Sequence, residues 1–81
     1  MTLLYFAWVR QKIGKNEEQL TAPVGDVAQL ISHLKNLGPR YADAFTDLSR
    51  IRVAVNQRHT GLDAKLGKDD EVAFFPPVTG G

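Results

Sequence analysis

Apolar and polar positions along the chain predict several short strands and one long helix. Residues 3–9 (LLYFAWV) form a continuous apolar and aromatic run, which predicts a strand covered on both faces. A buried helix start is the competing interpretation, because Val9 and Ile13 are four residues apart and one helical turn fits before Gly14. Residues 17–22 predict a second strand, and Pro23 and Gly25 end it.

The segment after Gly25 has the clearest helical pattern. Asp26 stands where an N-cap accepts backbone hydrogen bonds, and Gly38 suits a left-handed residue beyond the last turn. Pro39 cannot continue the helix, and Tyr41, Phe45 and Leu48 suggest a shorter helical stretch after it. The apolar stripe at helical spacing comprises Val27, Leu30, Ile31, Leu34 and Leu37.

Strands are predicted again in the last third of the chain. Residues 51–56 alternate, with Ile51, Val53 and Val55 on one face and Arg52 and Ala54 on the other, which indicates a half-buried strand. Residues 62–66 predict a short strand or a bend, and residues 67–70 a polar turn. Residues 71–75 (EVAFF) predict the last strand, which ends because proline has no amide for a sheet.

The order strand, strand, helix, strand, optional strand, strand predicts an α+β fold with one main helix packed across a mixed sheet. The domain is expected over residues 1–75, and residues 76–81 are expected to form a flexible C-terminal tail that ends in Gly-Gly. No internal repeat and no linker between domains is visible.

Composition narrows the classes of function. The 81 residues carry a net charge of +1, which gives little electrostatic attraction for nucleic acid. The absence of Cys excludes disulfides and a thiol nucleophile. No apolar run approaches the roughly 20 residues of a membrane helix, and the N-terminus lacks the basic region of a signal peptide. A cytoplasmic protein without membrane contact is therefore expected.

The side chains that usually carry catalysis do not form a motif. His33 lies within the predicted helix and His59 in a predicted polar loop, and they share no metal-ligand spacing. The acidic run Asp69, Asp70 and Glu71 is interpreted as a solvated turn, so no metal site is predicted. A basic group with an aromatic residue, Arg10, Lys12 and Lys15 near Trp8, would suit nucleic acid, but Trp8 is assigned to the apolar strand.

The C-terminus is the unusual feature. Two prolines stiffen the exit from the last strand, and six extended residues reach roughly 20 Å, enough to enter a deep pocket of another protein. Gly80 and Gly81 have no side chains, so the backbone can approach a reacting group closely. A terminal carboxylate becomes a good electrophile as an acyl-adenylate, and sulfur attack then yields a thiocarboxylate. Such a protein needs no catalytic side chain.

The chain resembles the small subunit of molybdopterin synthase, a ubiquitin-like sulfur carrier, over its whole length. The resemblance is carried by Phe6-Ala7-x-Val9-Arg10, by Ala54-Val55-Asn56-Gln57 and above all by residues 70–81 (DEVAFFPPVTGG). It implies the β-grasp fold, in which the first and last strands are parallel neighbours. One departure from the family is Lys68-Asp69 in the turn before the last strand, where family members often have Gly.

The resemblance also implies a function. An activating enzyme of the ubiquitin-activating type would adenylate Gly81 with ATP and magnesium, and a sulfurtransferase would convert it to a thiocarboxylate. The tail would then enter the large synthase subunit and donate sulfur to a cyclic pyranopterin precursor bound there. A heterotetramer of two small and two large subunits is implied, with the small subunit non-catalytic and without a stably bound cofactor.

Site residues are assigned on the same basis. Gly81 carries the sulfur, and the residues that thread the partner's pocket are Pro76, Pro77, Val78, Thr79 and Gly80. Phe75 is assigned to the partner interface because strand alternation puts Val72 and Phe74 on the core face and Phe75 on the other. Phe75 as a second core aromatic is the alternative. Arg10 is expected to pair with the partner.

Three other functions share these features. A sulfur carrier for thiamine thiazole or tRNA thiolation has the same fold and Gly-Gly end, although the Phe-Phe-Pro-Pro-Val stretch argues against it. A protein modifier conjugated through Gly81 would give ladders of conjugates. A ubiquitin-like binding module with an inert tail would function without Gly80 and Gly81.

Overall fold

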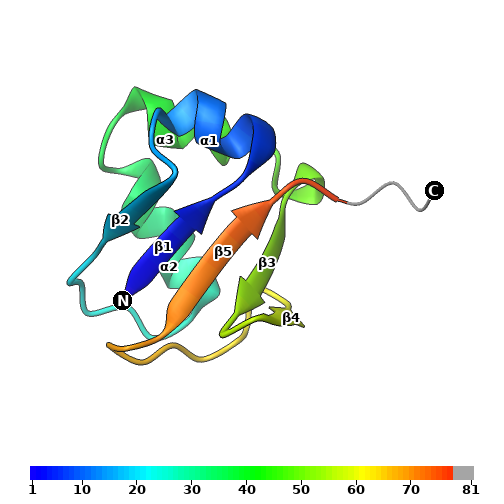
Figure 1. Ribbon diagram of the computed structural model, residues 1–81. Coiled ribbons are helices and arrows are strands. Elements are labelled where there is room, and N and C mark those ends of the chain that lie inside the picture. Colours follow the sequence, from blue (N-terminus) through cyan, green and yellow to red (C-terminus); the bar gives the residue numbers. More distant parts are fainter. Residues whose placement is uncertain (78–81) are drawn as a thin grey trace.

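The computed structural model describes residues 1–77 (Figure 1). It has a five-stranded mixed sheet with helices packed across it, which confirms the α+β prediction and the β-grasp fold. The elements are β1 (Thr2–Tyr5), α1 (Ala7–Ile13), β2 (Glu17–Gln19), α2 (Val27–Lys35), α3 (Pro39–Ala44), the 3₁₀ turn η1 (Leu48–Arg50), β3 (Arg52–Val55), β4 (Arg58–Thr60) and β5 (Glu71–Phe75).

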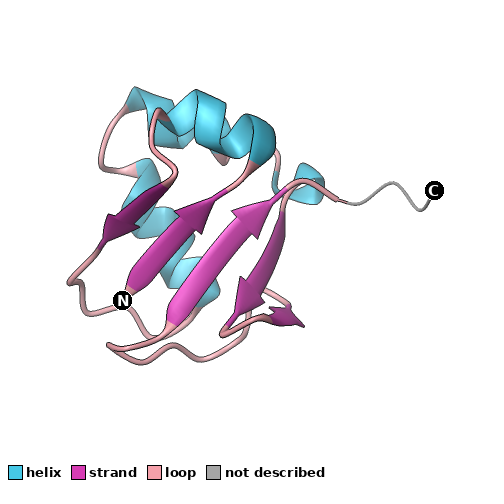
Figure 2. Cartoon of the chain, in the orientation of Figure 1, coloured by secondary structure: helices cyan, strands magenta, loops and turns pink. Residues whose placement is uncertain are grey.

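The sheet has the strand order β2-β1-β5-β3-β4, so the last strand lies at its centre. β1 and β5 are parallel, and Thr2 is in register with Glu71 and Tyr5 with Phe74. All other strand pairs are antiparallel. α2 crosses behind the sheet, and α1 and α3 lie over the end where β1 and β5 finish (Figure 2). The parallel pairing implied by the resemblance is therefore present.

The core lies between the sheet and α2. Alternate residues of β1 and β5 point into it, and Leu3, Val72 and Phe74 are fully buried. The Phe74 ring packs against Tyr5 at 6.1 Å and edge-on against Phe45 at 5.0 Å, measured between ring centroids. These rings join the central strands to the segment after α3, so the core extends under the helices.

The first apolar run is divided between a strand and a helix, and the prediction of one strand over residues 3–9 was wrong. β1 ends at Tyr5, and the helix start weighed as the alternative is the one observed, with Gly14 left-handed at the C-terminus of α1. The run is continuous because Val9 faces the core from α1 as fully as Leu3 does from β1. A continuous apolar run does not distinguish a buried strand from a buried helix.

α2 begins as predicted but ends earlier. Asp26 caps it, and its Oδ1 accepts a hydrogen bond of 2.8 Å from the Gln29 amide. Leu37 is 47% exposed and does not belong to the apolar stripe. Gly38 is extended rather than left-handed and precedes Pro39, which opens α3 instead of ending α2. Within residues 1–77, no helix has the length and apolarity needed to cross a membrane.

β3 continues into a hairpin that was not predicted from the sequence. Asn56 and Gln57 have positive φ angles of 52° and 70°, the geometry of a two-residue hairpin turn. β4 therefore pairs with β3, and His59 lies on this edge strand rather than in a polar loop. The bend over residues 62–66 contains only a bridge between Lys65 and Asp26. Ala54, expected on an exposed face, is 7% exposed.

A polar cluster fastens β2 to α3. The Glu18 carboxylate accepts hydrogen bonds from the hydroxyls of Tyr5 (2.7 Å) and Tyr41 (2.8 Å) and lies 3.3 Å from the Lys15 ammonium. Burial acts to raise the pKa of Glu18, but these hydrogen bonds outweigh it and the pKa lies below its ordinary value. Burial, with the nearby carboxylate, raises the pKa of Tyr5 well above its usual range. The cluster is therefore a carboxylate held by neutral tyrosines.

The junction between β1 and α1 stores backbone strain that one substitution can release. Ala7 has a φ of 53°, a left-handed conformation that costs a non-glycine residue roughly 1–2 kcal/mol. Ala7→Gly should raise the free energy of unfolding by about 1 kcal/mol, measured by urea denaturation. The control, Ala28→Gly in the exposed part of α2, should lower it by about 1 kcal/mol. Equal effects of the two substitutions would contradict the assigned strain.

Ionised Glu18 should make the free energy of unfolding decrease at acidic pH. Its folded-state pKa is depressed, so its contribution is fully present above the unfolded value of about 4.5 and is lost as the pH falls through the lower folded value. Glu18→Gln should therefore show a smaller drop in urea midpoint between neutral and acidic pH than the unmodified chain. The exposed neighbour substitution Glu17→Gln is the control, and it should keep the full drop.

Candidate functional site at the tail exit

The C-terminal tail leaves the domain where three elements meet, a region called here the tail exit (Figure 1). β5 ends at Phe75, which lies opposite Arg52 at the start of β3. On the other side, the Phe6 amide donates a 3.1 Å hydrogen bond to the Phe74 carbonyl. The first strand and the residue after it are therefore bonded to β5 as far as Phe74. Pro76 and Pro77 then continue outside the sheet. The tail therefore starts from a rigid base.

Phe75 faces away from the core, as strand alternation predicts. It is partly exposed, whereas Val72 and Phe74 are fully buried. Its ring packs edge-on against the His59 imidazole, with 5.3 Å between centroids. The alternative that Phe75 is a second core aromatic is therefore wrong. Its assignment to a partner interface stays a prediction that this placement favours.

The sheet face without helices has an apolar centre beside the tail exit. Register places Leu4, Ala73 and Ala54 in one row across β1, β5 and β3, on the face of Phe75. Phe6 follows β1 and is 47% exposed. Phe6 was missed from the sequence because it was assigned to a buried strand. The sequence gives no signal for this turn, because the left-handed conformation of Ala7 that leaves Phe6 outside the core is uncommon for alanine.

Arg10 lies on α1 and is exposed. Its carbonyl accepts the Gly14 amide at 2.8 Å, so the backbone ends the helix while the guanidinium remains available to solvent. Within residues 1–77 it forms no salt bridge with a carboxylate. This placement is compatible with the predicted partner contact and does not test it.

Trp8 and two further arginines lie at the same end of the sheet. Trp8 is on α1 and is half-buried, not part of a strand. The Arg50 guanidinium lies 5.4 Å from its ring centroid, a cation–π contact between η1 and α1. Nη1 of Arg52 donates to the carbonyls of Ser49 (3.3 Å) and Ile51 (3.2 Å). Both guanidinium groups are thus held close to the start of β3.

The acidic run before β5 has a structural role. The Asp70 carboxylate accepts hydrogen bonds from the Asn56 side-chain amide (3.0 Å) and the Gly67 backbone amide (2.7 Å), which hold its pKa below the usual range. The Asn56 side-chain oxygen accepts the Glu71 amide at 3.0 Å. These bonds fasten the hairpin turn to the start of β5. Among residues 1–77, no group of three or more acidic or histidine side chains is arranged to hold a metal ion.

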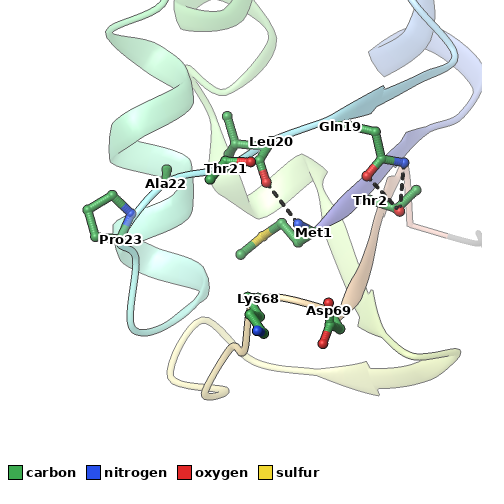
Figure 3. Close-up of a pocket in the computed structure, with 9 residues that line it drawn as sticks. All are labelled: Met1, Thr2, Gln19, Leu20, Thr21, Ala22, Pro23, Lys68 and Asp69. Atoms are coloured by element: carbon green, nitrogen blue, oxygen red, sulfur yellow. Dashed lines mark hydrogen bonds between the residues drawn. The ribbon is translucent and has the colours of Figure 1, made fainter.

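A cavity of about 690 Å³ lies at the opposite end of the sheet from the tail exit (Figure 3). Met1, Leu20 and Lys68 are among its lining residues, and the Met1 ammonium donates a 2.8 Å hydrogen bond to the Leu20 carbonyl. None of the residues assigned to the site lines this cavity. The cavity is therefore not assigned as the functional site, although it is large.

Four of the predicted site residues, Val78, Thr79, Gly80 and Gly81, lie outside the described residues. Of those described, Phe75, Pro76 and Pro77 lie together at the tail exit. The described part of the site supplies a base for the tail and a surface around it.

Comparison with known proteins decides the family. The ThiS family model matches residues 3–81. The chain belongs to the ThiS family. The chain is 40% identical over 79 residues to the molybdopterin synthase sulfur carrier subunit of Escherichia coli K12, covering 98% of this chain and 96% of the relative. The resemblance to the small subunit of molybdopterin synthase, inferred from the sequence, is thereby confirmed.

Two solved structures share the fold over nearly the whole chain. A putative molybdopterin converting factor subunit 1 from Pyrococcus furiosus matches with a TM-score of 0.78 and 33% identity, over 95% of both chains. SAMP1 from Haloferax volcanii matches with a TM-score of 0.79 and 25% identity, over 100% of this chain and 98% of the other.

A more distant structure shows the fold alone. It is a protein–protein complex of subunits 1 and 2 of molybdopterin-converting factor from Helicobacter pylori. The matching chain has a TM-score of 0.64 at 18% identity, and the match covers 99% of this chain and 96% of the other.

Adjacent phenylalanines of this ThiS family member should differ sharply in their effect on stability. Phe74→Ala removes a fully buried ring and should cost about 3–5 kcal/mol of unfolding free energy, with the milder Phe74→Leu as a variant that stays folded. Phe75→Ala should cost about 1 kcal/mol or less, because its ring is outside the core. Urea denaturation monitored by circular dichroism measures both. Equal losses would contradict the assignment of faces.

Proposed function

We propose that this chain is the sulfur carrier subunit of molybdopterin synthase and that its reactive group is the Gly81 carboxylate. The observation that carries the proposal is the full-length similarity to sulfur carrier subunits together with a last strand that ends at an exposed exit. The tail sequence Pro-Pro-Val-Thr-Gly-Gly starts from that exit. In this proposal the folded domain binds the partner proteins and positions the tail, and the chemistry occurs at the end of the chain.

The chemistry follows from the end group. Attack of the Gly81 carboxylate on ATP, assisted by magnesium in the activating enzyme, forms an acyl-adenylate and releases pyrophosphate. A sulfide equivalent supplied by a sulfurtransferase then displaces AMP and leaves a thiocarboxylate. Transfer of that sulfur to a pyranopterin precursor restores the carboxylate with an oxygen from water. Glycine at both terminal positions lets the backbone approach each reacting centre without steric obstruction.

The tail exit supplies the surface on which the large subunit docks. Phe75 and Phe6 present partly exposed rings on either side of β5's end, beside the apolar row Leu4, Ala73 and Ala54. A few aromatic anchors with an apolar centre are typical of a specific interface. Arg10 extends this surface along α1 as a charged contact.

A partnership with a large subunit is supported by the Helicobacter pylori structure, in which subunit 1 is in complex with subunit 2. The working assembly in the proposal is a heterotetramer of two small and two large subunits, and the activating enzyme and sulfurtransferase are further partners. No cofactor is bound stably by the chain in this scheme, and the reaction takes place in the cytoplasm. Nucleic acid and membranes have no part in it.

One alternative has an observation in its favour. The likeness to SAMP1, the small archaeal modifier protein 1 of Haloferax volcanii, favours a protein modifier conjugated through Gly81. The same acyl-adenylate would then be attacked by a lysine amine instead of sulfur.

An intact mass spectrum tests the proposal directly. The chain is incubated with its activating enzyme, ATP, magnesium and a sulfur source. Exchange of one oxygen for sulfur at Gly81 is the expected result, and addition of the large subunit with precursor should reverse it. Ladders of lysine conjugates without thiocarboxylate would favour the modifier.

Deletion of Gly80 and Gly81 should separate folding from function. The truncated chain should keep its thermal midpoint and its affinity for the large subunit within a few-fold, because both depend on the domain and the tail exit. It should form no thiocarboxylate and support no synthase turnover. Phe75→Ala is the converse control, which should form thiocarboxylate but bind the large subunit about tenfold or more weakly. Full synthase activity of the truncated chain would refute the carrier role.

A further inference from the structure

The tail exit carries more positive charge than its assigned residues account for. Arg50 and Arg52 both lie at the start of β3, within three residues of each other, and both are exposed. The salt bridges formed within residues 1–77 are Lys12–Asp43 and Lys15–Glu18, so neither arginine is neutralised by one. Two neighbouring like charges without an ion pair raise the energy of the unbound chain unless a partner supplies negative charge.

Nearby carboxylates remove only part of this excess. Asp47 is beside Arg50, but its Oδ1 is engaged by the Ser49 hydroxyl (2.6 Å) and the Ser49 amide (3.1 Å). These bonds, aided by the charge of Arg50, hold the pKa of Asp47 below its usual range, so it stays charged as a cap of η1. Asp43 is bound to Lys12 at 2.9 Å. Asp47 therefore offsets part of the charge of Arg50, whereas no salt bridge within residues 1–77 involves Arg52.

Both arginines are held in place before any partner arrives. The Arg50 guanidinium lies over the Trp8 ring, and Arg52 is anchored by two backbone carbonyls of the same short segment. A cavity of about 220 Å³ is lined by Trp8 and Arg50 together with Lys12, Asp43 and Asp47. Preorganised arginines lose little side-chain entropy when they form an ion pair, which makes them effective interface residues.

We propose that Trp8, Arg50 and Arg52 form a cationic shelf beside the tail exit, which docks an acidic surface of the large subunit that takes up the tail. The inference rests on the proposed function and adds the electrostatic half of the same interface. The two guanidinium groups are anchored on different partners, a ring and a pair of carbonyls, so they present a spread surface rather than one converging phosphate site. An acidic protein surface fits that spread better than a single phosphate group does.

The shelf also explains how the tail finds its pocket. The opposite end of the sheet carries the acidic run before β5, but Lys68 and the Met1 ammonium lie beside it and offset part of its charge. An acidic partner surface attracts the end with Arg50 and Arg52. Steering of this kind raises association rates by roughly 10- to 1000-fold and weakens with salt. The approaching partner thus meets the tail exit first.

The test compares charge reversals at both ends of the chain. Association of the full-length Arg50→Glu and Arg52→Glu chains with the immobilised large subunit is followed by surface plasmon resonance at low and at high salt. Each variant should associate about tenfold more slowly at low salt, with dissociation little changed, and the difference should shrink at high salt. The matched control Lys65→Glu changes net charge equally but lies beyond the sheet's other end, and it should associate at the unmodified rate or faster.

Other outcomes separate the shelf from the proposed function. Equal association rates for all three variants, with circular dichroism showing each one folded, would overturn the shelf while leaving the carrier role intact. Failure of the unmodified chain to bind the large subunit would instead refute the proposed function. ATP titrated against the free chain, with the fluorescence of its single tryptophan as the readout, tests for a nucleotide site. Submillimolar ATP binding lost in Arg50→Glu would overturn the assignment to a protein surface.

Discussion

Parallel pairing of the first and last strands is the constraint on which the rest of this structure depends. β1 and β5 are more than sixty residues apart in sequence, yet they form the centre of the sheet and share the Tyr5–Phe74 ring contact. Two parallel strands cannot be joined by a tight turn, so everything between them must leave the sheet and return. α2 packs across the face that the central strands bury, and β2 and the β3–β4 hairpin extend the sheet on either side of the central pair.

The same pairing determines where chemistry is possible. Because β5 is central, β1 holds it on one side as far as Phe74 and β3 holds it on the other as far as Phe75, so the chain beyond it starts from a fixed position. Because side chains alternate along β5, the adjacent residues Phe74 and Phe75 lie on opposite faces of the sheet. Phe74 completes the core, and Phe75 remains at the surface beside Phe6. Strand geometry alone thus gives the tail a defined base.

Sequence reasoning recovered the parts governed by simple periodicity. The stripe of α2 as far as Leu34 and the faces of β5 follow from spacings of 3.6 and 2 residues, and the structure agrees with both and with the Asp26 cap. The prediction failed at residues 6–10. The apolar run there is continuous, so it shows neither the strand nor the helix periodicity, and the left-handed Ala7 ends the strand and begins a helix. The prediction also missed β4, because the turn at Asn56-Gln57 lacks the glycine that normally signals a hairpin. Phe6 was lost with the first error, and the arginines at the tail exit belong to different elements that only the fold brings together.

The position of β5 has a consequence for biosynthesis. Chains are made from the N-terminus, and the strand that completes this sheet is among the last segments to be synthesised. Nascent chains therefore cannot assemble the central pairing early, and folding waits for nearly the entire sequence. A product that stops short within β5 lacks both the core ring of Phe74 and the base of the tail. A chain that stops within β5 is therefore exposed to proteases as an unfolded chain, whereas a chain that stops after Phe75 keeps the folded domain.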